Sequence, residues 1–159
     1  MTTHAFLHSQ QTKRHWGGPV VGGFFLSMGG VHLGIATSDP STYQHFADDA
    51  LFAFVRDGWQ DVFMAHPTFF GLLLMAAETT AGILLLLGGR FATVGWAAVA
   101  VFHVLLGLFS FGIWVWCVPA LVLIGYLARR DTTTRWGRAR HLGGGDVRPV
   151  QLRSAAAPR

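Results

Sequence analysis

The chain has 159 residues, of which 52% are hydrophobic and only 13% are charged, and its mean hydropathy is positive. A soluble domain carries about 25% charged residues, so this composition excludes an ordinary soluble protein and indicates one small membrane domain with room for about four crossings. The net charge of +4 comes mostly from arginines after the last apolar run. That position is typical of orientation signals and lipid contacts rather than of nucleic-acid binding.

Residues 1–16 are polar and without apolar periodicity, which predicts a flexible cytoplasmic segment. Residues 17–36 form the first apolar run, and we interpret them as the first membrane crossing. A cleaved signal peptide with Lys13 and Arg14 as its basic region is the alternative, although the run is long for one. Small residues spaced by four predict close approach of another helix. Such pairs are Gly23 with Ser27 and Gly30 with Gly34.

The segment between the first and second apolar runs is acidic. Within residues 44–63, apolar side chains recur every three or four positions, which predicts an amphipathic helix lying at the membrane interface. The alternative is a folded loop that only covers the end of the helices. Asp57, Asp61 and His66 could form a metal-binding face, but a solvated acidic face is the favoured interpretation. We therefore predict no metal site.

Three further crossings are predicted at residues 68–88, 91–109 and 113–128. Only Gly88, Gly89 and Arg90 separate the second and third crossings, so these helices should be antiparallel neighbours. Together the crossings define a transmembrane domain over residues 17–128. The predicted fold is an all-α, integral membrane four-helix bundle with an amphipathic interfacial helix. Residues 129–159 are basic and lack a core-forming pattern, which predicts a disordered cytoplasmic tail.

The distribution of basic residues predicts the orientation of the chain. Lys13 and Arg14 precede the first crossing, Arg90 lies between the second and third, and an arginine cluster follows the fourth. The other two connections are acidic or uncharged. Because basic loops stay in the cytoplasm, both termini and the Arg90 turn should be cytoplasmic. We predict a multi-pass protein of a bacterial plasma membrane.

Three ionisable side chains lie within the predicted crossings: His32, Glu78 and His103. At about 1.5 Å per residue they lie about 21, 15 and 20 Å from the cytoplasmic ends of their helices. Because an unpaired carboxylate at this depth is costly, Glu78 should face inward and pair with a histidine. Gly82 shares the helical face of Glu78, and Trp96 shares that of His103. We predict that these five residues form a buried ligand site.

Four interpretations of this constellation remain open. The polar pair could only hold the helices together, or it could line a pocket for a quinone or another redox ligand. A bis-histidine haem held by His32 and His103 is disfavoured, because no haem motif is present. A small-solute or proton pathway is the fourth. Cys117 is the only cysteine, so no disulfide or dithiol mechanism can form within the chain.

The second and third crossings resemble the DoxX-like family of small bacterial membrane proteins. The resemblance is carried by Glu78, Gly82, the Leu84–Leu87 run, the Gly88-Gly89-Arg90 turn and the alanine-rich Phe91–Val101 stretch. It implies a four-helix bundle and a connection to quinone-linked or thiol redox systems. By motif match, Glu78 and Arg90 are the positions that carry over. The first crossing differs from the family pattern, because His32 and Asp39 stand where a basic residue is expected.

The resulting hypothesis is a redox-linked membrane subunit that binds a quinone-like ligand at Glu78, His103 and His32. Whether the protein is itself an enzyme stays open. The alternative is a non-catalytic scaffold that docks a membrane or periplasmic partner or a second copy of the chain. A small permease or proton pathway ranks third, since four crossings are few for a transporter and no inverted repeat is visible.

Overall fold

The computed structural model describes residues 16–143, with side chains placed as far as Asp131. This part of the chain is helical, with connecting turns and no strand. The described chain is all-helical, as predicted, and four of its helices are long and apolar enough to span a membrane, which supports a membrane protein. They are α1 (Gly17–Ser38), α3 (Pro67–Leu87), α4 (Gly89–Leu106) and α5 (Phe111–Gly143).

The helix bounds agree with the predicted crossings to within a few residues, except at the end of α5. That helix continues to Gly143, beyond residue 128, where the sequence analysis ended the last crossing. No proline interrupts the sequence after Pro119 in this helix, and its end coincides with the first of three consecutive glycines. The rest of the predicted tail and the predicted flexible segment before residue 16 lie outside the described residues.

Helices α1 and α3 pack against each other more closely than any other pair, through facing glycines. A Cβ atom added to Gly22 would lie 2.9 Å from the carbonyl oxygen of Gly82, and one added to Gly82 would lie 2.7 Å from that of Gly22. Only glycine permits this approach, since real Cβ contacts are longer. The predicted small-residue pairs do not make this contact. Gly23, Gly30 and Gly34 instead have no neighbouring atom within 4 Å of a Cβ position.

A two-residue turn reverses the chain between α3 and α4. Gly88 and Gly89 have φ angles of 69° and 56°, in the left-handed region that glycine adopts without strain. The end of the molecule that contains this turn is called the Gly88 end below. The buried apolar core lies beside the turn and joins α1, α3, α4 and α5. It consists of Phe25, Ala81, Leu85, Ala92, Trp96, Val99 and Ile124.

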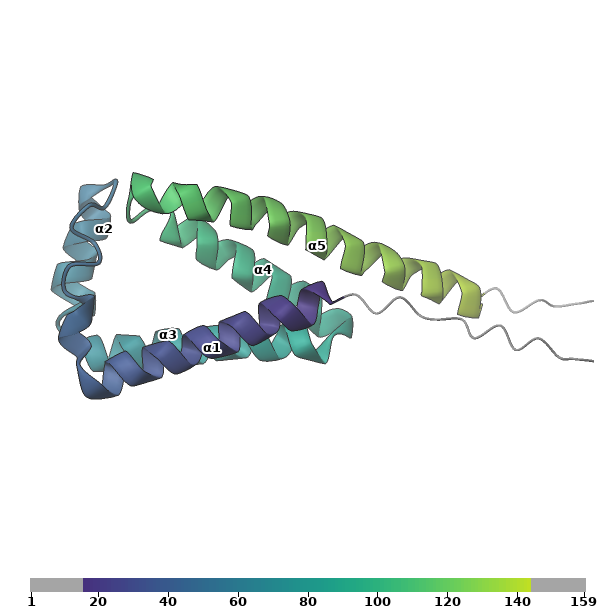
Figure 1. Cartoon of the computed structure of the whole chain (residues 1–159), viewed down its shortest axis with the longest axis horizontal. Coiled ribbons are helices and arrows are strands. Elements are labelled where there is room, and N and C mark those ends of the chain that lie inside the picture. The colour runs from purple at the N-terminus through teal and green to yellow at the C-terminus, as the bar shows by residue number, and fades with distance from the viewer. Residues whose placement is uncertain (1–15, 144–159) are drawn as a thin grey trace, which may run out of the picture.

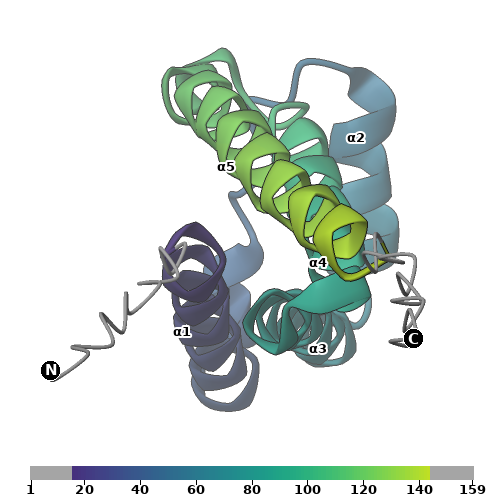
Figure 2. The ribbon, with the colours of Figure 1, turned by 90° about the vertical axis from the view of Figure 1, so that its right-hand side faces the viewer.

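The helices form two arms (Figures 1 and 2). One arm is α1 with α3, and the other is α4 with α5. The arms meet near the Gly88 end and diverge toward the opposite end, called the Tyr43 end below. The segment 39–66 bridges the arms at that end (Figure 1). It contains a 3₁₀ turn η1 (Pro40–Tyr43), a short helix α2 (Ala53–Gly58) and a π-helical turn η2 (Trp59–Phe63).

The predicted helix over residues 44–63 forms only from Ala53 onward, because the first part of this range is folded into turns. The Leu51 amide donates to the Leu108 carbonyl at 3.0 Å, and this hydrogen bond attaches the bridging segment to the turn between α4 and α5. The Trp59 indole donates to the Tyr43 carbonyl at 2.9 Å. Tertiary contacts therefore replace the continuous helical ladder that the sequence periodicity predicted.

Candidate functional site

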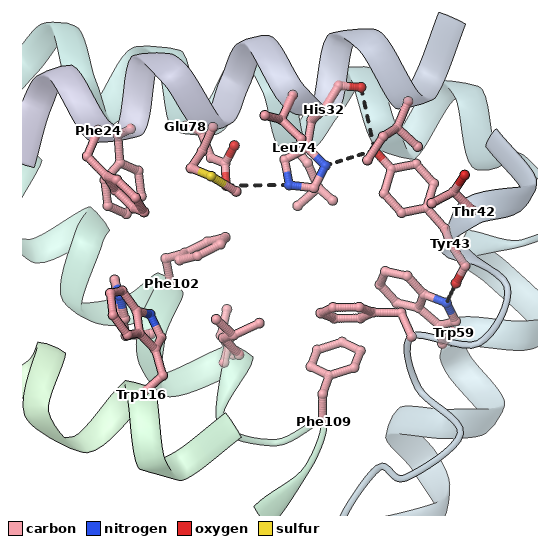
Figure 3. Close-up of a pocket in the computed structure, with 18 residues that line it drawn as sticks. Phe24, His32, Thr42, Tyr43, Trp59, Leu74, Glu78, Phe102, Phe109 and Trp116 are labelled. Carbon is pink, nitrogen blue, oxygen red and sulfur yellow. Dashed lines mark hydrogen bonds and ion pairs between the residues drawn. The ribbon is translucent and has the colours of Figure 1, made fainter. Parts of the chain in front are cut away.

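A cavity of about 500 Å³ lies between the two arms, next to the Tyr43 end (Figure 3). Side chains from all four long helices and from the bridging segment line it, and most of them are apolar. This volume is typical of small-molecule sites, which span about 300–1,000 Å³. Aromatic rings make up much of the wall. They belong to Phe24, Phe25, Phe46, Trp59, Phe102, Phe109 and Trp116.

Glu78 is the most buried charged group of the described chain, with 2% of its surface exposed. It lies on the face of α3 that also buries Gly71, Gly82 and Leu85. Its Oε1 atom is 3.6 Å from Nε2 of His32, which forms the predicted pair between Glu78 and a histidine. Its other oxygen, Oε2, is buried and has no hydrogen-bond partner among the described residues. Leaving such an oxygen without a donor in an apolar environment costs free energy, and a bound ligand could supply that donor.

The close approach of α1 to α3 brings His32 to Glu78. A Cβ added to Gly29 would lie 2.5 Å from Oγ1 of Thr79, so the helix backbones are very near each other at this level. His32 follows Gly29 by three residues, which is about one helical turn. The glycine therefore sets the position from which the imidazole reaches across the interface.

Tyr43 extends the polar group toward the Tyr43 end of the molecule. Its hydroxyl lies 2.8 Å from Nδ1 of His32, and the two rings stack with centroids 5.7 Å apart. Burial raises the pKa of the Tyr43 phenol above its usual value, and the negative charge of Glu78 raises it further. The phenol therefore stays protonated and available as a donor.

The turn that places Tyr43 is formed by the residues immediately after α1. The Asp39 side chain accepts from the Ser41 amide at 3.2 Å and from the Ser41 hydroxyl at 2.5 Å. Pro40 starts the 3₁₀ turn. Sequence reasoning missed Tyr43, although Asp-Pro-Ser is a recognisable turn signal that reverses the chain onto the end of the first crossing.

His103 lines the same cavity from α4, but it does not pair with Glu78. Its Nδ1 atom is 2.9 Å from the Val99 carbonyl oxygen. Because a carbonyl only accepts, Nδ1 carries the proton, and Nε2 of the neutral ring is then an acceptor. The ring packs against Phe25, with centroids 6.1 Å apart. The cavity thus brings together His32, Glu78 and His103, which the sequence placed at similar depth.

The two other residues of the predicted site lie elsewhere. Trp96 is part of the core, and its indole donates to the Asp131 carboxylate at 3.2 Å. It does not line the cavity. Gly82 lies at the contact between α1 and α3, where its missing side chain makes room for the Gly22 backbone and Leu26 rather than for a ligand. The shared helical face correctly placed Gly82 and Trp96 on the buried sides of their helices, but both lie too far along the helix axis to reach the cavity.

The acidic residues of the bridging segment take no part in the cavity. Asp57, Asp61 and His66 are exposed to solvent. Among the residues whose structure is described, no group of three or more histidine, cysteine or acidic side chains could hold a metal ion.

Comparison with protein-family models, with curated proteins and with solved structures gives no match to this chain. The chemistry of the site is therefore argued from its geometry. A mainly apolar and aromatic cavity with a few polar groups favours a largely apolar ring as ligand. The unpartnered oxygen of Glu78 and the acceptor nitrogen of His103 both favour hydroxyl groups on that ring.

Proposed function

We propose that this protein is a redox-linked membrane subunit that binds a quinone-type ligand in the cavity, preferentially in its reduced form. The observation that carries the proposal is Glu78, whose side chain lines a mainly apolar cavity and whose Oε2 atom has no hydrogen-bond partner among the described residues. A hydroquinone has two hydroxyl donors on an apolar ring, whereas the oxidised quinone has only acceptors. The ring is thus of the right polarity for the walls, and its hydroxyls are of the right kind for the free polar atoms.

When it is ionised, the Glu78 carboxylate gains most from such a ligand. Its Oε1 faces His32 at 3.6 Å, and Oε2 accepts a hydrogen bond from a hydroxyl group of the ligand. A hydrogen bond to a charged group contributes about 1.5–3 kcal/mol. Tyr43, bonded to the other nitrogen of His32, holds the imidazole in place. His103 offers its Nε2 to the second hydroxyl from the opposite arm.

In this proposal the chain is a DoxX-like four-helix bundle of a bacterial plasma membrane. The residue pattern around Glu78 and Arg90 supports the family, and the basic residues near the Gly88 end support cytoplasmic termini. The bridging segment 39–66 then lies outside the cytoplasm, where the exposed Phe54 and Val62 of the α2–η2 region rest at the membrane interface.

Binding of a short-chain ubiquinol and of the matching ubiquinone to the purified protein in nanodiscs tests the proposal. Bound ligand is measured under anaerobic conditions by extraction and absorbance, after subtraction of empty nanodiscs. Wild type should bind the quinol more tightly than the quinone. Glu78→Gln should weaken quinol binding by about tenfold or more, because a charge-assisted bond is lost, and should change quinone binding much less.

Asp57→Asn is the matched control, because it makes the same chemical change at an exposed carboxylate. It should leave both affinities unchanged. Thermal unfolding of each variant separates loss of binding from loss of fold. Equal binding by wild type and Glu78→Gln, or no binding of either ligand form, would refute the proposal.

A docking role is the second candidate function, and the outer surface of α1 favours it. Gly23, Gly30 and Gly34 face open space, so a partner helix could approach α1 there as closely as α3 does on the other side. Cross-linking in native membranes from a cysteine placed at Gly30 should then capture one defined partner or a second copy. A protein that stays monomeric and uncross-linked would exclude this role.

A further inference from the structure

A second cavity of about 360 Å³ lies between α1, α4 and α5. It shares four lining side chains with the first cavity, so the two are neighbours separated only by these groups. The shared residues are Phe24, Phe25, His103 and Trp116. All other residues that line the second cavity are apolar, and they include Val20 on α1 and Ala120 and Leu123 on α5.

The second cavity opens toward the outside of the helices. Helices α1 and α5 make far fewer contacts with each other than α1 makes with α3, and they stand apart when the molecule is viewed along its helices (Figure 2). Val20 is 65% exposed and Leu123 is 53% exposed. Both lie within the spans that are apolar enough to cross a membrane, so the medium outside this opening is hydrocarbon rather than water.

We propose that the second cavity is a lateral passage for the hydrocarbon tail of the ligand, so that the site takes a lipid-soluble quinol directly from the bilayer. This inference rests on the proposed function, and it adds the class of ligand and its route. With the ring beside Glu78 and His103, the tail runs between Phe24 and Trp116 and leaves through the gap between α1 and α5.

The chemistry of the passage supports a tail rather than a polar substituent. Apart from the imidazole and indole at the shared boundary, its lining side chains have no polar atom. A polar chain would lose its hydrogen bonds to water there without replacement. A saturated or isoprenoid chain loses nothing, because it exchanges lipid contacts for protein contacts.

The proposed passage can be tested by blocking it, which distinguishes a required route for the tail from a site where the tail has no fixed position. If the passage is blocked, a ligand with a tail cannot place its ring, whereas the same ring without a tail still fits the first cavity. Ala120→Trp fills the passage from α5. Val122→Trp is the matched control, since Val122 is 69% exposed and lines neither cavity. Val20→Trp blocks the passage from α1 and covers the case in which Ala120→Trp does not fold.

The experiment measures binding of decylubiquinol and of the tail-less dimethoxy-methyl hydroquinone to full-length protein in nanodiscs, with ligand concentration expressed per lipid. Ala120→Trp and Val20→Trp should weaken decylubiquinol binding by about tenfold or more and leave the tail-less ligand within about twofold. Val122→Trp should change neither. A decylubiquinol carrying a photoreactive group in its tail should label residues that line the second cavity.

Unchanged decylubiquinol binding in both blocking variants, or equal weakening of both ligands in folded variants, would overturn the inference while leaving the proposed function intact. Labelling of α3 or of the bridging segment instead of α1 and α5 would also overturn it. Failure of wild type to bind either ligand would refute the proposed function itself, which is a distinct result.

Discussion

Helix α1 has two different neighbours and contacts them in opposite ways. Toward α3, glycines let the backbones approach until a Cβ on Gly22 would collide with the Gly82 carbonyl. Toward α5 the contacts are few, and a cavity of about 360 Å³ that is lined by Phe24 lies between the two helices. The same helix therefore forms the tightest helix–helix contact of the described molecule on one side and one wall of a cavity on the other.

This difference shows how a small membrane protein can combine a tightly packed helix pair with cavities between its other helices. Apolar surface gains little from burial against other helices in a bilayer, because lipid is equally apolar. Close backbone packing is what stabilises the pair of α1 and α3. The remaining contacts can then stay loose and leave room for a ligand, provided that the buried Glu78 is held at the edge of the tight interface by His32.

The largest expected effect comes from breaking the tight contact. Gly22→Leu places a side chain against the Gly82 backbone, which cannot move aside, and should cost about 3 kcal/mol or more of unfolding free energy or prevent folding. Gly23→Leu is the matched control, because no atom lies within 4 Å of a Cβ there. Unfolding by titration with a denaturing detergent measures both. Similar stability of the two variants would contradict the close packing of α1 on α3.

A smaller effect is expected from removing the polar link in this interface. His32→Leu leaves the buried Glu78 without its polar partner and should cost about 1–3 kcal/mol. Adding Glu78→Gln removes the buried charge and should recover most of that loss, so the double variant should be more stable than His32→Leu alone. Detergent-induced unfolding of the two single variants and the double variant gives the coupling energy. Simple additivity would show that the pair does not interact.

The smallest effect concerns the loose side. Pro119 lines the passage and lies inside α5, where it removes one backbone hydrogen bond and softens the helix. Pro119→Ala restores a bond worth about 0.5–1 kcal/mol and should slow association of decylubiquinol about two- to fivefold. Pro67→Ala, at the start of α3 where no bond is missing, should not change the rate. Stopped-flow mixing measures both rates, and faster association in Pro119→Ala would contradict this role.

Much of the fold follows from local sequence signals. Four apolar runs of about 20 residues predict the four long helices because bilayer thickness sets their length. Glycines at 88 and 89 predict the tight turn, which the structure forms with positive φ angles. Similar depth along the helices places His32, Glu78 and His103 at nearly one level, because depth depends only on the rise per residue, and all three line the first cavity.

What depends on helix rotation could not be predicted in this way. Four glycines of α1 could each face α3. Their spacing alone does not show whether Gly22 and Gly29 or Gly23 and Gly30 make the contact. Trp96 shares a helical face with His103 but lies about two turns away, in the packed core instead of the cavity. The contribution of Tyr43 depends on a chain reversal that periodicity does not describe.

The turn at Gly88 and Gly89 also bears on how the protein is made. Two residues cannot span any distance across a bilayer, so α3 and α4 can enter the membrane only together, as one helical hairpin. Helix α1 is synthesised first and packs against α3 through the facing glycines once the hairpin has inserted. Helix α5 is synthesised last and packs against α4. In this order of assembly the contact between α1 and α5 forms last, and it is far smaller than the contact between α1 and α3.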